Sequence, residues 1–124
     1  MLFRSHLQQG EPADAVRDFD TVIAGYTTPN DGIEVYIGRG IARAKLGDLA
    51  GAEADLSLAR EWARGKDRVL NALANRAALR EMKGDAAGTQ ADRAEHERLK
   101  DLPKKNKEFV RPMKGADEPT KGKG

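Results

Sequence analysis

A glycine that precedes an acidic residue returns at a fixed interval along this chain. Its three copies are Gly10, Gly47 and Gly84, and the two intervals, 47 minus 10 and 84 minus 47, are both 37 residues. Other residues keep the same register, namely Ala15, Ala52 and Thr89, then Asp18, Asp55 and Asp92, then Phe19, Leu56 and Arg93. Equal intervals of this length indicate an array of repeated units, and the three glycines are predicted to form the turns within the units.

The stretch from Tyr36 to Ala59 contains one complete unit. Apolar residues recur at helical spacing on both sides of Gly47, which predicts two helices joined by a tight turn. Tyr36, Gly40, Ala52 and Leu56 stand at the offsets of the tetratricopeptide repeat signature. Arg39 and Arg43 depart from it. The unit therefore resembles a tetratricopeptide repeat, and the resemblance implies stacked helix pairs that bind proteins. Because the family period is roughly 34 residues, we expect lengthened connections between units.

These patterns predict an all-α fold, a short α-solenoid of antiparallel helix pairs with about two and a half repeats in residues 1–102. The expected helices cover about residues 2–9, 12–25, 31–45, 49–62, 68–82 and 86–102. Pro12 suits the first turn of the second of them. The first unit lacks half of its leading helix, so an array that starts with a partial unit and a piece of a longer protein both stay open. The last helix carries polar residues at the repeat positions and is expected to close the array.

Gly40 and Trp62 each need an explanation within this array. Gly40 breaks a helix-forming pattern, and the resemblance implies that it lies where two paired helices cross most closely. Trp62 continues the apolar stripe of its helix and is expected to pack on Leu70 or Leu73. A binding hot spot is the alternative for Trp62.

The composition limits the compartment and the core. With one Trp, two Tyr, three Phe and 39% hydrophobic residues, the core must be built mostly from alanine and leucine. The chain has no cysteine, which suits a reducing compartment. It has neither the apolar run of a signal peptide nor that of a membrane span. We therefore expect a soluble, cytoplasmic protein without membrane contacts.

The positive charge is concentrated at the C-terminal end. Residues 1–99 hold 14 Lys and Arg against 16 Asp and Glu, or −2, whereas residues 100–124 hold 8 against 4, or +4. Residues 103–124, rich in Lys, Gly and Pro, are predicted to form a disordered basic tail. Phe109, Val110 and Met113 are its large apolar residues and could fold back on the last helix or dock on a partner. Nucleic acid is not expected as the main partner, although a tail that attracts nucleic acid or another acidic surface is an alternative function.

Catalytic chemistry has few candidate residues. The chain has two histidines, His6 and His96, in the first and last units, and two serines, Ser5 and Ser57. Asp92 and His96 share a helix face, but two ligands are too few for a structural metal site, and we interpret them as a surface ion pair. We expect no enzyme activity, no metal and no cofactor.

The resemblance implies a concave face on which the leading helices bind a peptide or a partner helix. The positions that register with this face are Arg4, Gln8, Glu34, Ile37, Ile41, Lys45, Asn71, Asn75 and Met82. The predicted function is thus a protein-interaction scaffold, or adaptor, for a protein or peptide partner. A structural module that forms homo-oligomers through its exposed N-terminal helix is a further alternative.

Overall fold

The computed structural model describes residues 2–110, with side chains for residues 11–29 and 31–110, as an all-α structure. Its elements are α1 (Leu2–Ala24), η1 (Pro29–Asp31), α2 (Ile33–Lys45), α3 (Leu49–Trp62), α4 (Lys66–Lys83), α5 (Ala86–Lys100) and η2 (Lys107–Phe109), where η marks a short 3-10 helix. The described part of the chain contains no strand. None of its helices is long and apolar enough to cross a membrane.

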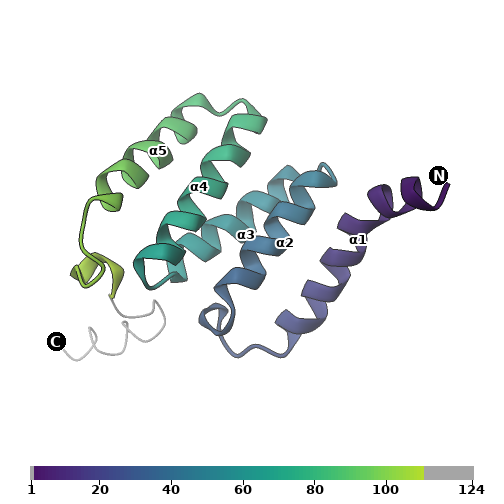
Figure 1. Cartoon of the computed structure of the whole chain (residues 1–124), viewed down its shortest axis with the longest axis horizontal. Coiled ribbons are helices and arrows are strands. Elements are labelled where there is room, and N and C mark those ends of the chain that lie inside the picture. Colours follow the sequence, from purple (N-terminus) through teal and green to yellow (C-terminus); the bar gives the residue numbers. More distant parts are fainter. Residues whose placement is uncertain (1, 111–124) are drawn as a thin grey trace.

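The five helices pack in chain order, each antiparallel to the next (Figure 1). In addition, α2 contacts α4 directly, so these two helices form one layer over α3. The predicted all-α class and the sequential packing of antiparallel helices are therefore confirmed. Figure 1 shows α1 at one end of the row and α5 at the other.

Two of the three predicted turn glycines form the same turn. Gly47 and Gly84 have φ angles of 89° and 82°, which an L residue rarely adopts. After each glycine an aspartate caps the next helix: Asp48 accepts a hydrogen bond from the Gly51 N–H, and Asp85 accepts one from the Gly88 N–H, both at 2.9 Å. The sequence Gly-Asp-x-x-Gly thus forms the same helix-to-helix turn twice.

Gly10 does not form a third turn, and this prediction is wrong. α1 continues through Gly10, so Pro12 lies inside a helix and not in its first turn. The residues of the cap explain the difference. A Cβ atom at Gly51 would lie 2.3 Å from Oδ2 and 3.0 Å from the capping Oδ1 of Asp48, so the cap needs glycine there. The first copy has the longer Glu11 at the capping position and Asp14 in place of the second glycine, and Asp14 pairs with Arg17 instead.

Small residues let the helices approach closely. Ala52, Ala59 and Ala72 have no exposed surface, and Leu56 and Leu73 fill the space between them. A Cβ atom at Gly40 would lie 3.0 Å from Leu56 Cγ and 3.3 Å from the Ala52 oxygen, which confirms that Gly40 sits at a close helix crossing. Trp62 is half-buried and packs against the same core, as the core interpretation predicted.

The segment after α5 does not follow the prediction of a disordered tail. Phe109 is fully buried in the core, and its carbonyl oxygen accepts a hydrogen bond of 2.6 Å from the Gly65 N–H. Lys66 Nζ also donates to the Leu102 oxygen at 2.8 Å. The packed part of the chain therefore continues beyond residue 102 to Val110. The remaining predicted tail, with Met113, lies outside the described residues.

Candidate functional site

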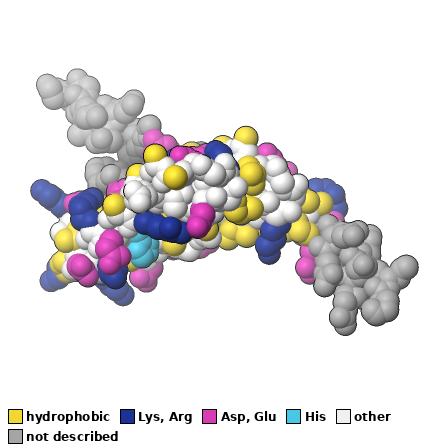
Figure 2. Space-filling model, turned by 90° about the horizontal axis from the view of Figure 1, so that it is seen from above, with side chains coloured by type: hydrophobic (Ala, Val, Ile, Leu, Met, Phe, Trp, Pro, Cys, Tyr) yellow, Lys and Arg dark blue, Asp and Glu magenta, His cyan; other side chains and the backbone are white. Residues whose placement is uncertain are grey.

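Four of the predicted partner-binding residues lie together in a groove between α2 and α4. The groove has a volume of about 210 Å³ and is lined by Gly40, Ile41, Ala44, Lys45, Leu56, Asn75, Ala78, Leu79 and Met82. Ile41 and Met82 are 37% and 61% exposed, which is unusual for large apolar side chains. Lys45 and Asn75 add one cation and one amide to a mostly apolar surface. Figure 2 shows hydrophobic side chains gathered over the middle of the elongated molecule.

The other predicted residues do not join this groove. Ile37 is only 4% exposed and belongs to the core, so its side chain offers little surface to a partner. Glu34 is exposed and accepts a 2.7 Å hydrogen bond from Arg68, which lowers the pKa of Glu34. The side chains of Arg4 and Gln8 lie outside the described residues.

Asn71 lies one helical turn before Asn75 and is exposed beside the groove. Asn75 Nδ2 donates to the Asn71 backbone oxygen at 2.9 Å and to Asn71 Oδ1 at 2.8 Å. This pairing fixes the Asn75 amide with its nitrogen toward Asn71. The Asn75 oxygen consequently faces the other way, where it can accept a hydrogen bond from a bound peptide.

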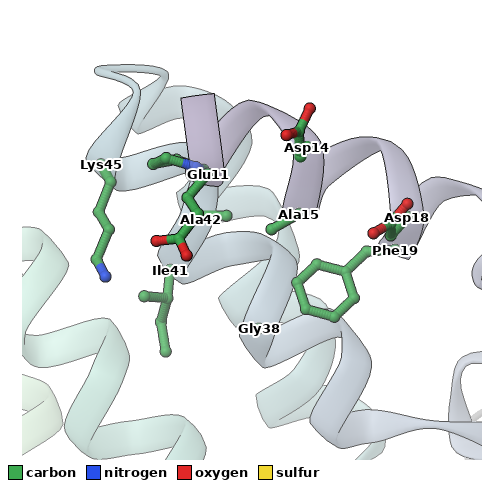
Figure 3. A pocket seen from close by; sticks show the side chains of 10 residues that line it. Glu11, Asp14, Ala15, Asp18, Phe19, Gly38, Ile41, Ala42 and Lys45 are labelled. Atoms are coloured by element: carbon green, nitrogen blue, oxygen red, sulfur yellow. The ribbon is translucent and has the colours of Figure 1, made fainter. Parts of the chain in front are cut away.

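A larger hollow of about 430 Å³ lies between α1 and α2 (Figure 3). It is lined by Glu11, Pro12, Asp14, Ala15, Asp18, Phe19, Gly38, Ile41, Ala42 and Lys45. Three carboxylates on α1 make its rim acidic. The Phe19 ring lies over Gly38, where an added Cβ atom would be 2.8 Å from the ring. Ile41 and Lys45 line both this hollow and the groove between α2 and α4.

A buried aspartate held by two arginines is the feature that sequence reasoning missed. Arg39 donates two hydrogen bonds to the Asp55 carboxylate, at 2.9 and 2.8 Å, and Arg43 donates a third at 3.2 Å. Asp55 is 3% exposed. Arg39 also donates to Asp20 on α1 at 2.7 Å. The hydrogen bonds from Arg39 to these carboxylates, led by Asp55, raise the pKa of Arg39.

The same cluster occurs a second time, 37 residues further along. Arg76 donates to both Asp92 carboxylate oxygens at 2.9 and 2.8 Å, and Arg80 adds a bond of 3.2 Å. Arg76 also reaches back to the preceding helix, where it donates to Ser57 Oγ at 3.2 Å. Asp92 is 2% exposed, so its interpretation as a surface ion pair with His96 is wrong. The signal was present in the sequence as two Arg-x-x-x-Arg pairs and two aspartates, all at the 37-residue interval.

Metal-binding geometry is not found in the described part of the chain. No group of three or more His, Asp and Glu side chains there could hold a metal ion. The Ser57 hydroxyl accepts a hydrogen bond from Arg76. No protein-family model matches the chain, and no curated protein or solved structure matches it either. The groove between α2 and α4 offers a ligand apolar contact, one positive charge and one amide.

Proposed function

We propose that this protein is a tetratricopeptide-like scaffold that binds a protein segment in the groove between α2 and α4 and has no catalytic activity of its own. The observation that carries the proposal is the meeting of Ile41, Lys45, Asn75 and Met82 on two adjacent helices. The internal 37-residue register, in which turns and ion-pair clusters recur, supports the repeat character of the fold.

The chemistry of the groove indicates what the segment carries. Ile41, Ala78 and Met82 offer contact for one or two apolar side chains, and methionine adapts easily to different shapes. Lys45, beside them, suits an acidic residue or a C-terminal carboxylate, and the Asn75 oxygen suits a backbone N–H group. The proposed ligand is therefore a short segment with an apolar anchor next to an acidic group.

Selection from a phage-displayed library of random peptides tests this function. The expected peptides bind the wild-type chain and bind the Ile41→Asp and Met82→Asp variants at least about tenfold more weakly, because a charge in an apolar contact is poorly solvated. Val22 and Val110 are 46% and 55% exposed and lie outside the groove, so Val22→Asp and Val110→Asp are matched controls that should bind normally.

The groove must also be separated from the C-terminal tail. A chain that ends at Val110 keeps the buried Phe109 and removes only residues 111–124. Peptide binding that survives this truncation supports the groove. Selected peptides that bind all groove variants equally well, or that need residues 111–124, would show that the function is elsewhere.

A further inference from the structure

The hollow between α1 and α2 matches, residue by residue, a surface that is covered one repeat later. Adding 37 to Phe19, Gly38, Ile41, Ala42 and Lys45 gives Leu56, Asn75, Ala78, Leu79 and Met82, all of which line the groove between α2 and α4. The α1 residues of the hollow, Ala15 and Asp18, register with Ala52 and Asp55 of α3. The two surfaces are therefore built from equivalent positions.

The α3 residues of the second surface are covered by α2, whereas the equivalent α1 residues of the first are not covered by any helix in the described part of the chain. On α3, Ala52, Asp55 and Leu56 are 0%, 3% and 1% exposed. At the equivalent positions on α1, Ala15 and Phe19 are only half-buried and Asp18 is exposed. Figure 3 shows Ala15, Asp18 and Phe19 among the side chains that line the hollow. The uncovered surface is thus the position of a leading helix, and we call it the α1 face (Glu11, Ala15, Asp18, Phe19, Gly38).

The covering helices show which residues such a helix needs. α2 places Arg39 and Arg43 on Asp55, with Gly40 at the close crossing, and α4 places Arg76 and Arg80 on Asp92, with the buried Ala77 at the equivalent place. Both helices therefore read Arg, a small residue, two further residues, and Arg. On the α1 face, Asp18 is the equivalent of the aspartates that these arginines bind. Glu11 is the equivalent of Asp48, whose carboxylate lies 3.9 Å from Arg43.

The chain's own N-terminal segment does not fit this position. The residues 37 positions before Arg39, Gly40 and Arg43 are Leu2, Phe3 and His6. Leucine cannot pair with Asp18, and the Phe3 ring is far larger than the crossing allows at Gly40. In the structure, residues 2–10 continue along α1 instead. A second copy of the chain is also a poor source, because both of its Arg-small-x-x-Arg helices already hold their own aspartates.

We propose that the α1 face is a docking site for an α-helix of a partner protein that carries Arg-Gly-x-x-Arg or Arg-Ala-x-x-Arg. The two arginines bind Asp18 as Arg39 and Arg43 bind Asp55, and the small residue lets the helix approach Ala15 and Phe19. Charge complementarity agrees with this choice, since Glu11, Asp14 and Asp18 form the rim. This site is separate from the groove proposed above, although Ile41 and Lys45 border both.

A peptide with the sequence of residues 32–47 is the probe, because it is the chain's own covering helix. Its binding to the full chain is measured by fluorescence anisotropy. We expect binding that falls at least about tenfold when the peptide carries Arg39→Ala and Arg43→Ala, or when the protein carries Asp18→Asn, since each change removes the same charge-assisted hydrogen bonds. Combining both changes should cause no further loss, as expected for one shared interaction.

Asp14→Asn is the matched control. It removes one charge from the same rim, but Asp14 registers with Gly51 and Gly88, which have no side chain that could bind an arginine, so binding should fall less than about threefold. A peptide with lysines in place of both arginines keeps its charge and loses the bidentate geometry, so it should bind weakly. The Met82→Asp variant should bind the peptide normally, which separates this test from that of the groove.

Three outcomes would overturn the proposal. They are the absence of any binding by the wild-type peptide, equal effects of Asp14→Asn and Asp18→Asn, and equal binding by the arginine and lysine peptides. The last two would indicate general attraction between basic and acidic surfaces. Because Asp18 is exposed, Asp18→Asn should unfold at the same urea concentration as the wild type, so that a loss of binding does not reflect a loss of folding.

Discussion

The two ends of the helical row are completed in different ways. At the C-terminal end, the segment after α5 folds back, buries Phe109 completely and accepts hydrogen bonds from Gly65 and Lys66 at the start of α4. At the N-terminal end, α1 leaves Phe19 half-buried and Asp18 exposed. Within residues 2–110, the chain covers its helical row at the C-terminal end and leaves the α1 face open. The uncovered end is where a partner can gain the most by binding.

The two equivalent aspartates Asp55 and Asp18 provide the sharpest form of this comparison. Replacing Asp55 with alanine should lower the free energy of unfolding by about 3 to 5 kcal/mol, because Arg39 and Arg43 lose their partner inside the protein. Asp18→Ala should change it by less than about 0.5 kcal/mol, as for other exposed residues. Urea unfolding followed by circular dichroism measures both.

Asp92→Ala is the internal check on the Asp55 result. Asp92 is held by Arg76 and Arg80 with the same distances, so it should show a loss similar to that of Asp55→Ala. A large effect of Asp18→Ala would mean that Asp18 already has a buried partner, and the contrast between covered and uncovered copies would fail.

Phe109 and Phe19 compare the two ends directly. Phe109→Ala should cost about 3 kcal/mol, because it removes a fully buried ring and leaves a cavity. Phe19→Ala should cost less than half as much, since the ring is partly in water before the substitution. The measurement is again urea unfolding, with the slope against urea checked for a constant value. Equal losses would mean that the N-terminal end is covered in solution.

The helices, the turns and part of the groove could be predicted from the sequence, because local residue patterns determine them. The helices on either side of Gly47 and Gly84 were predictable because local periodicity, a left-handed glycine and a capping aspartate agree. The groove was half predictable: the register found Ile41, Lys45, Asn75 and Met82 but placed the buried Ile37 beside them. Periodicity gives the face of a helix, but it does not tell which of two apolar neighbours the next helix covers.

The remaining features depend on contacts between residues far apart in sequence. Phe109 is buried because its segment returns to Gly65, and composition alone describes that segment as polar. Arg39 and Arg43 depart from the repeat signature, which records apolar positions and so does not predict that both arginines bind Asp55. The turn at Gly10 was predicted from the 37-residue spacing. Glu11 and Asp14 replace the aspartate and glycine that form the cap in the other two copies, and α1 continues through Gly10.

Substituting the glycines distinguishes a turn from a continuous helix by the sign of the effect. Gly84→Ala should destabilise by about 1 to 2 kcal/mol, since alanine is strained at a φ of 82°. Gly10→Ala should instead stabilise by up to about 1 kcal/mol, because alanine favours a helix interior. Thermal unfolding resolves both shifts. If Gly10→Ala destabilised like Gly84→Ala, then residue 10 would be a turn and α1 two helices.

The smallest expected effect concerns a contact that the N-terminal copy lacks. Glu53 on α3 accepts hydrogen bonds from Arg80 at 2.7 and 3.0 Å and from Lys83 at 3.0 Å, whereas Val16 occupies the equivalent position on α1. The Arg80 bond lowers the pKa of Glu53 below its ordinary 4.5. The stabilisation is therefore complete above about pH 4.5 and is lost as the pH falls through the lower folded-state pKa. Glu53→Gln should reduce the free energy of unfolding by about 1 kcal/mol at pH 7 and hardly at all near pH 2.

Glu34→Gln is the control for this pH dependence, since Glu34 also has an arginine partner but is largely exposed. Its substitution should leave the free energy of unfolding almost unchanged at both pH values, because water screens an exposed ion pair. Urea unfolding of the wild type and both variants at several pH values gives the comparison. A Glu53→Gln deficit that stays constant down to pH 2 would show that packing, and not the charge on Glu53, links α3 to α4.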